Sequence, residues 1–103
     1  MKIIGIGKNY VVDKEEIKTI KNGEQLIFLK AESTLVTDNK DVVYPSITNE
    51  LAYEVELVIK IGKKGKDISV ANAGSYISEI AVGIDYTAKD VLAQSRANKG
   101  PWA

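Results

Sequence analysis

The sequence predicts a β-rich α+β fold in a single domain that spans residues 1–103. Two observations carry this prediction. Several short segments alternate apolar with polar residues, a period of two that is typical of half-buried strands. These segments do not alternate regularly with the helical ones, which argues against a doubly wound parallel sheet. The chain has the usual length of one domain, and no repeat or linker divides it.

Three strands and a short helix are predicted in the first half of the chain. The isoleucine-rich residues 2–7 predict a buried strand, and residues 26–30 and 41–44 predict two more. A short helix is expected to begin near Asp13. The acidic run at residues 13–16 is typical first of a helix N-terminus, which acids stabilise, and only second of a catalytic acid pair.

The second half of the chain predicts a helix, a strand and a last helix. All three follow the strand at residues 53–61, which is described in the next paragraph. A helix with Ser69 as its N-cap is expected to run through residue 77, although Gly74 weakens it. Residues 79–86 alternate as a strand. Thr87 and Asp90 resemble a capping box that opens a last helix, which is expected to end near residue 98.

Residues 53–57 read YEVEL and continue a strand pattern to residue 61. Side chains at i and i+2 share one face of a strand, so Glu54 and Glu56 lie side by side. They could form the solvated face of an antiparallel sheet, or they could converge on a hard cation, which prefers oxygen ligands. A cation would need a third ligand. Asp85 could supply it from the end of the next strand, where Ala81 and Gly83 leave space.

Composition excludes several classes of function. Lys and Arg together number 14, as do Asp and Glu, so no bulk charge exists to hold nucleic acid or an anionic membrane, and we expect neither partner. The chain contains no Cys and no His, which excludes disulfides, thiolate sites, Ser-His-Asp catalysis and His-ligated zinc within it. No apolar run approaches the length of a membrane span, so a cytoplasmic protein is expected.

Two weaker motifs have simple structural interpretations. Gly5-Ile6-Gly7 begins like a dinucleotide fingerprint but lacks its continuation, so close backbone packing is the better interpretation. The lysines of residues 60–66 are typical of a solvated turn.

Several motifs occur together in an order that resembles the fumarylacetoacetate hydrolase family. They are GKNY at 7–10, FLKAEST at 28–34, YEVEL at 53–57, GIDYTAKD at 83–90 and KGPW at 99–102. The resemblance covers nearly the whole chain. It implies the mixed sheets of that family's β-sandwich or roll, with short helices.

The resemblance also implies a metal centre and a class of substrate. Glu54, Glu56 and Asp85 would hold Mg²⁺ or Mn²⁺. The metal would chelate a small 2-keto acid and stabilise its enolate. Members of the family hydrolyse acylpyruvates and related diketones, decarboxylate oxaloacetate, or isomerise and decarboxylate 2-hydroxy-diene dioates.

Departures from the family pattern affect the candidate catalytic residues. The family's His-x-x-Glu acid-base pair aligns with Asp13 and Glu16, so the histidine that would activate water is absent. The family's arginine is Lys89 here, which keeps the charge and loses the bidentate geometry. Asp13, Glu16 and Lys89 are therefore the candidate catalytic residues, and Lys30 and Lys89 the candidate substrate-binding residues.

The family's domain is longer than this chain, which resembles its N-terminal part and stops before an expected Lys-Gly-Phe-Asp segment. We therefore expect little or no hydrolase activity from the chain alone. An exposed apolar sheet face is also expected, and with it a homodimer or a partner chain that completes the domain. Two alternatives to the hydrolase remain open: an isomerase or decarboxylase, and a catalytically incompetent assembly module.

Overall fold

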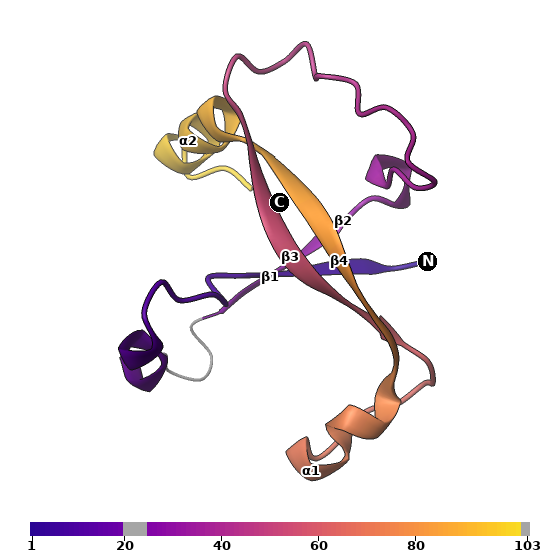
Figure 1. Cartoon of the computed structure of the whole chain (residues 1–103). Helices are drawn as coiled ribbons and strands as arrows, with labels where there is room; N and C mark the ends of the chain where they lie inside the picture. Colours follow the sequence, from indigo (N-terminus) through magenta and orange to yellow (C-terminus); the bar gives the residue numbers. More distant parts are fainter. Residues whose placement is uncertain (20–24, 102–103) are drawn as a thin grey trace. The chain divides into compact units, whose positions relative to one another are not determined.

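The computed structural model describes residues 1–19 and 25–101, so Trp102 of the KGPW motif lies outside the described residues. It contains, in chain order, β1 (Ile3–Gly7), η1 (Lys14–Thr19), β2 (Leu26–Lys30), η2 (Glu32–Thr34), β3 (Leu51–Ile61), α1 (Val70–Ala73), η3 (Gly74–Tyr76), β4 (Ile77–Ala88) and α2 (Lys89–Ala97), where η denotes a 3-10 helix (Figure 1). The strand-rich α+β class is confirmed. The chain divides into two compact units, one of Met1–Val43 with Pro101–Ala103 and one of Tyr44–Gly100. That they form one domain stays a prediction.

The first unit is organised around the antiparallel pair β1–β2, which confirms both predicted strands. Gly5 lies directly opposite Phe28 in this pair. A Cβ atom on residue 5 would lie 2.2 Å from Cζ of the Phe28 ring, so no other residue fits there unless the ring moves. The Gly5-Ile6-Gly7 run thus allows two strands to pack closely, which is the interpretation that the sequence favoured.

The second unit is organised around β3 and β4, which form one long antiparallel ribbon. Its ladder runs from the pair Leu51↔Ala88 to Ile61↔Ile77, with a register shift between Lys60 and Ile61. Figure 1 shows α1 at one end of the ribbon and α2 at the other. The connection at the α1 end is closed by the Gly62 amide, which donates to the Tyr76 carbonyl at 2.8 Å. β3 begins two residues before its predicted start, and β4 extends beyond its predicted bounds at both ends.

The strand predicted at residues 41–44 is wrong. These residues have no regular secondary structure. A strand needs a neighbour for its backbone hydrogen bonds, and the described strands pair only as β1–β2 and β3–β4.

The predicted helices form with altered ends. The helix after Ser69 is a single α turn that has Gly74 as its C-cap and tightens into η3 before residue 77 enters β4. The predicted capping box before α2 is wrong, because Thr87 pairs with Ala52 inside the ladder and the N-cap position is Ala88. Among the described residues, no helix combines the length and the apolar character that crossing a membrane requires.

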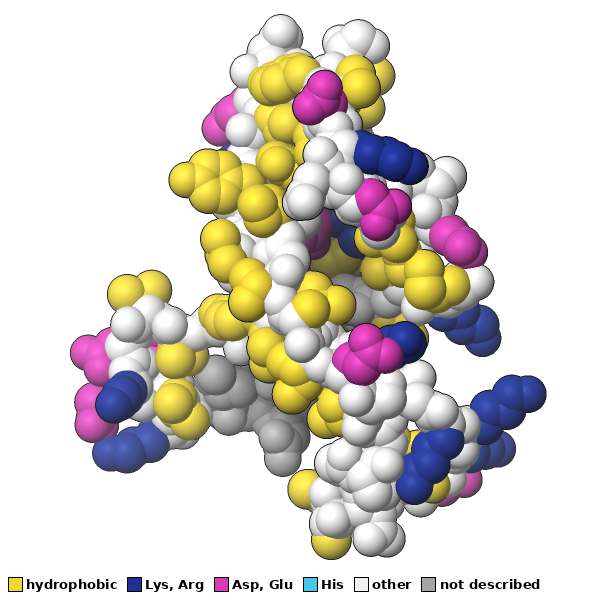
Figure 2. All heavy atoms as spheres, turned by 45° about the vertical axis from the view of Figure 1, so that its right-hand side comes forward, with side chains coloured by type: hydrophobic (Ala, Val, Ile, Leu, Met, Phe, Trp, Pro, Cys, Tyr) yellow, Lys and Arg dark blue, Asp and Glu magenta, His cyan; other side chains and the backbone are white. Residues whose placement is uncertain are grey.

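The apolar face of the β3–β4 ribbon is uncovered. It consists of four cross-strand pairs, namely Tyr53↔Tyr86, Val55↔Ile84, Leu57↔Val82 and Ile59↔Ile80. Their exposed fractions range from 39% for Tyr86 to 74% for Val82. No hydrophobic side chain is buried within residues 1–19 and 25–101, and Figure 2 shows many such side chains at the surface. The expected exposure of an apolar sheet face is confirmed.

Candidate functional site

The opposite, polar face of the β3–β4 ribbon carries the three predicted metal ligands. Glu54 pairs directly with Asp85, and Glu56 pairs with Gly83. Directly opposite residues of an antiparallel pair project to the same side, with Cβ atoms about 4.5–5.5 Å apart. Glu56 lies two residues beyond Glu54 and therefore shares its face. The register thus brings Glu54, Glu56 and Asp85 onto one face, near the α2 end of the ribbon.

The surroundings of these carboxylates are tighter than the sequence indicated. Glu54 is exposed, whereas Glu56 and Asp85 are half-buried. A Cβ atom on residue 83 would lie 2.7 Å from Cγ2 of Val58. Val58 therefore occupies the space that was predicted above Gly83, and glycine is the residue that accommodates it.

The donor set suits a hard divalent cation, but its members are not gathered around one point. Carboxylate oxygens are the ligands that Mg²⁺ and Mn²⁺ prefer. Within the described part of the chain, however, no three His, Cys, Asp or Glu side chains are close enough together to hold a metal ion. The strands thus supply the chemistry and the shared face, and binding would require the side chains of Glu54, Glu56 and Asp85 to rotate toward one another. Their assignment as ligands stays a prediction.

The other end of the same polar face is neutralised. Lys60 lies opposite Glu79, and Nζ of the lysine is 2.6 Å from Oε1 of the glutamate. Beyond it, the ammonium group of Lys63 lies 4.3 Å from the centre of the Tyr76 ring. These contacts agree with the interpretation of the lysine-rich turn as an ordinary solvated surface.

The start of α2 contains a polar cluster that the sequence did not reveal. Asp90 accepts hydrogen bonds on Oδ1 from the Thr48 hydroxyl and on Oδ2 from the Asn49 amide, the latter at 2.9 Å. The Val91 amide also donates to Oδ1, at 2.9 Å. The Thr48 hydroxyl, followed by the Asn49 amide, lowers the pKa of Asp90 below its ordinary value. Thr48 and Asp90 are 42 residues apart, and no local motif connects them.

Lys89 is the first residue of α2, and its side chain is exposed. Its backbone amide donates to the Glu50 carbonyl at 2.8 Å, which ties the start of the helix to the residue before β3. Its predicted catalytic and substrate-binding roles stay predictions.

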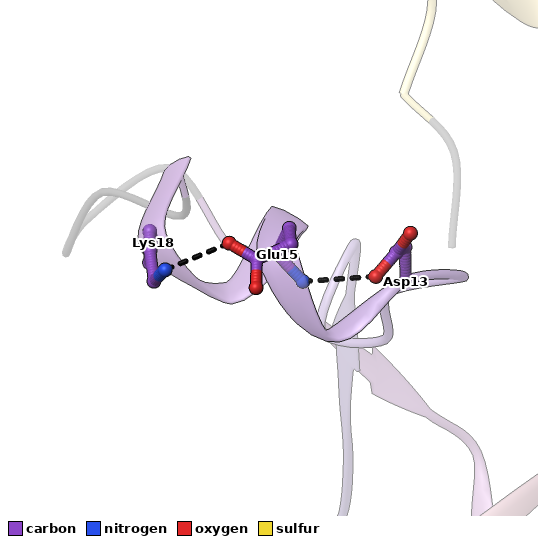
Figure 3. Close-up of polar contacts among 3 residues, drawn as sticks. All are labelled: Asp13, Glu15 and Lys18. Carbon is purple, nitrogen blue, oxygen red and sulfur yellow. Dashed lines mark hydrogen bonds and ion pairs between the residues drawn. The ribbon is translucent and has the colours of Figure 1, made fainter.

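Asp13 and Glu16 lie in the first unit, where their carboxylates bind backbone amides at the start of η1. Oδ1 of Asp13 accepts from the Glu15 amide at 3.0 Å, and Oε2 of Glu16 accepts from the Val12 amide at 3.1 Å. Figure 3 shows the Asp13 contact and the neighbouring ion pair of Glu15 with Lys18. This pattern is that of acids at a helix N-terminus, the first of the two interpretations from sequence. The catalytic interpretation is untested.

Lys30 is the last residue of β2 and lies opposite Ile3, half-buried. It also belongs to the first unit. Its predicted contact with substrate is untested.

Comparison with known proteins identifies the family. The family model described as Fumarylacetoacetate (FAA) hydrolase C-terminal matches residues 2–103. A mitochondrial oxaloacetate tautomerase from Arabidopsis thaliana is 34% identical over 101 residues, which are 98% of this chain and 45% of that protein. The homoprotocatechuate catabolism bifunctional isomerase/decarboxylase of Escherichia coli is 37% identical over 90 residues, which are 87% of this chain and 21% of that protein.

A solved structure agrees with this grouping. The crystal structure of a candidate fumarylpyruvate hydrolase from Burkholderia cenocepacia matches with a TM-score of 0.86 and 31% identity, over 99% of this chain and 43% of that one. The chain thus spans less than half the length of these proteins. Because the family model covers residues 2–103, the chain belongs to the fumarylacetoacetate hydrolase family.

Proposed function

We propose that the chain forms part of a divalent-metal-dependent enzyme that hydrolyses an acylpyruvate or a related 2-keto or 1,3-diketo acid. Membership of an enzyme family supports the general class of activity. The observation that carries the metal dependence is the β3–β4 register, which aligns Glu54, Glu56 and Asp85 on one face. Like charges directly opposite each other destabilise a sheet, and a cation would relieve that cost.

In this proposal Glu54, Glu56 and Asp85 hold Mg²⁺ or Mn²⁺. When bound, the ion supplies positive charge for the adjacent carboxylate and keto oxygens of a 2-keto acid. The carboxylates must be deprotonated to bind it, and each side chain must turn toward its neighbours on the polar face. Replacing Glu54 and Glu56 by Gln would retain the shape of the strand and remove two of the charges.

The two lysines would bind negatively charged groups of the substrate. Lys89 would act as a single point charge, without the paired contacts that an arginine makes. Lys30 is the second candidate for this role.

Asp13 and Glu16 would transfer protons. Both carboxylates accept backbone hydrogen bonds in this structure, so each would have to give up such a contact, or use its other oxygen, to reach a substrate.

A second function is tautomerisation, isomerisation or decarboxylation of a 2-keto acid. The absence of histidine favours it, because these reactions need no water molecule activated by a general base. The names of two relatives, an oxaloacetate tautomerase and a bifunctional isomerase/decarboxylase, support it as well.

The activities are distinguished by assaying the whole gene product and the 103-residue chain on an acylpyruvate and on oxaloacetate. We expect acylpyruvate cleavage by the gene product that a chelator abolishes, that Mn²⁺ restores, and that Glu54→Gln with Glu56→Gln reduces about 100-fold or more. The 103-residue chain alone should show little or no cleavage. Enol–keto conversion of oxaloacetate without acylpyruvate cleavage would favour the second function. Turnover that neither a chelator nor the double substitution affects would contradict both.

The exposed apolar face motivates a proposal about partners. We propose that a second copy of this chain, or another polypeptide that completes the domain, covers the four apolar cross-strand pairs in solution. Their exposure, up to 74% at Val82, is large for a stable sheet in water and supports this assembly.

A further inference from the structure

The carboxylate of Asp90 fastens the segment before β3 to the first turn of α2. Its two oxygens accept from the Thr48 hydroxyl and the Asn49 amide, which are provided by adjacent residues of that segment. Thr48 is only 3% exposed and is the one buried residue among those that the structure describes. If the partner of a hydroxyl shielded from water is removed, the hydroxyl is left without a hydrogen bond and the folded protein is destabilised. The pairing of Thr48 with Asp90 is therefore specific. We call Thr48 and Asp90 the clasp.

A continuous set of hydrogen bonds leads from the clasp into the β3–β4 ladder. The Glu50 amide donates to the Thr48 hydroxyl oxygen at 3.1 Å, and the Glu50 carbonyl accepts from the Lys89 amide at 2.8 Å. The next residues, Leu51 and Ala88, form the first pair of the ladder, and Glu54↔Asp85 is the third pair after it. The clasp therefore lies at the end of the ribbon where the carboxylates face each other.

This end of the ribbon has no connection of its own between the strands. The chain passes from β3 to β4 at the far end, through α1 and η3, and the register shift between Lys60 and Ile61 is also at that far end. A slip of one residue would turn every side chain of a strand to the other face, which would separate Glu54 from Asp85. The ladder itself sets this register, and contacts at the α2 end can keep its last pairs, Glu54↔Asp85 among them, from fraying or shifting.

We propose that Thr48 and Asp90 are positioning residues that hold Glu54 opposite Asp85 so that the two carboxylates can bind a divalent cation. This inference rests on the metal site of the proposed function. It adds two residues that do not touch the metal and whose effect passes through the first pairs of the ladder. Replacing residues that hydrogen-bond a metal ligand directly changes metal affinity by about 10–100-fold, and this range is the upper bound for the clasp, which acts through the ladder.

The test is direct Mn²⁺ binding to the whole gene product, measured by electron paramagnetic resonance of free Mn²⁺. Asp90→Asn places a donor NH₂ where an acceptor oxygen faces the Asn49 amide, and Thr48→Val removes the hydroxyl with little change of shape. We expect each to weaken Mn²⁺ binding, by up to about 10–100-fold, and Thr48→Ser to retain near-native affinity. Binding is measured where circular dichroism shows each variant folded.

A matched control comes from the far end of the same ribbon. The Ser78 hydroxyl donates to the Lys60 carbonyl at 3.2 Å, so Ser78→Ala also removes a hydroxyl-to-ladder contact, remote from the acidic pair. It should leave the Mn²⁺ affinity unchanged. If Ser78→Ala and the clasp variants all weaken binding in proportion to their loss of stability, the clasp is merely structural and the proposal is overturned.

The remaining outcomes separate the two proposals. If the unsubstituted protein binds Mn²⁺ and the clasp variants bind it equally well, the positioning role is wrong and the metal site stands. If the unsubstituted protein binds no Mn²⁺, the metal site itself is wrong, and the positioning role with it.

Discussion

The two ends of the polar face of the β3–β4 ribbon differ in how they pair charges. At the α1 end Lys60 lies opposite Glu79, and the two form an exposed ion pair. At the α2 end Glu54 lies opposite Asp85, with Glu56 beside them. Opposite charges across a strand pair contribute about 0.2–1 kcal/mol, whereas like charges cost stability. The same two strands thus place opposite charges across from each other at one end and two carboxylates across from each other at the other.

This difference distinguishes the acidic end from the charge-balanced, solvated end of the same ribbon. The complementary Lys60–Glu79 pair indicates that this ribbon can place opposite charges across its two strands. The acidic end carries three carboxylates on one face, which is the donor set for a hard cation. The comparison therefore supports metal binding at the α2 end.

The largest expected effect concerns the apolar face, the other side of the same ribbon, which we propose is covered by a second copy or another polypeptide. Val55→Lys together with Ile84→Lys places two charges in the middle of that face. Because each buried apolar side chain contributes about 1.5–3 kcal/mol, the pair should convert an assembly into monomers or unfold it. Sedimentation at micromolar concentration with circular dichroism measures both outcomes. Val58→Lys, on the polar face, is the control.

A compact, cooperatively melting monomer of the unsubstituted chain at micromolar concentration would contradict that prediction. So would unchanged association of the double variant.

A charge reversal at the α1 end should lower stability by placing two carboxylates opposite each other, as at the α2 end, without creating a metal site. Lys60→Glu places a carboxylate opposite Glu79, and the free energy of unfolding should fall by about 0.5–1 kcal/mol at low salt. No metal response should appear there, because the neighbouring pair on this face is Val58↔Ala81 and provides no third carboxylate. Denaturant unfolding with and without Mn²⁺ checks both statements. If Lys60→Glu gave the α1 end a Mn²⁺ response as large as that of the native site, the proposed difference between the two ends would be wrong.

The reverse change at the acidic end should stabilise the metal-free protein. Glu54→Lys makes an opposite-charge pair with Asp85, so the free energy of unfolding without metal should rise by about 0.2–1 kcal/mol. The gain should shrink in high salt, because exposed charges are screened. If Glu54→Lys instead lowered the free energy of unfolding in the absence of metal, Glu54 would already stabilise the metal-free protein.

The smallest expected effect is a pH dependence from Asp90. Its pKa is lowered in the folded protein, so its contribution to stability is fully present above its ordinary pKa of 3.8 and is lost as pH falls through the lowered folded value. The stability difference between the unsubstituted protein and Asp90→Asn should therefore be constant above that range and shrink below it. Urea unfolding across acidic pH measures this. A difference that instead begins to shrink near neutral pH would contradict the assignment to Asp90.

The sequence predicted local strands well and long-range contacts poorly. Apolar, strand-prone residues identified β1 and β2, and alternation identified the central parts of β3 and β4, because burial of one face imposes a period of two. The same reasoning failed at residues 41–44, because apolar character does not reveal whether a neighbouring strand exists. It also assigned Asp90 to a local capping box, whereas its partner Thr48 is 42 residues away.

The same period of two made part of the candidate metal site predictable. The i, i+2 spacing of Glu54 and Glu56 fixes their common face within one strand, whereas Asp85 was only a possible third ligand from its place in the next strand until the resemblance to a family joined it to them. The register then aligned Asp85 with Glu54. The position of Val58 over Gly83 depends on a side-chain rotamer across the ladder, which no spacing encodes.

The most direct test of the central claim is a Mn²⁺ titration of thermal unfolding for the unsubstituted protein and for Glu54→Gln with Glu56→Gln. If Mn²⁺ binds only the folded form, stabilisation grows with concentration and reaches about 2.7 kcal/mol at a hundredfold excess over Kd. The double variant should be no less stable without metal and should show no Mn²⁺-dependent rise in Tm. An equal rise in both proteins, or none in the unsubstituted one, would show that the acidic end of the ribbon is an ordinary solvated surface.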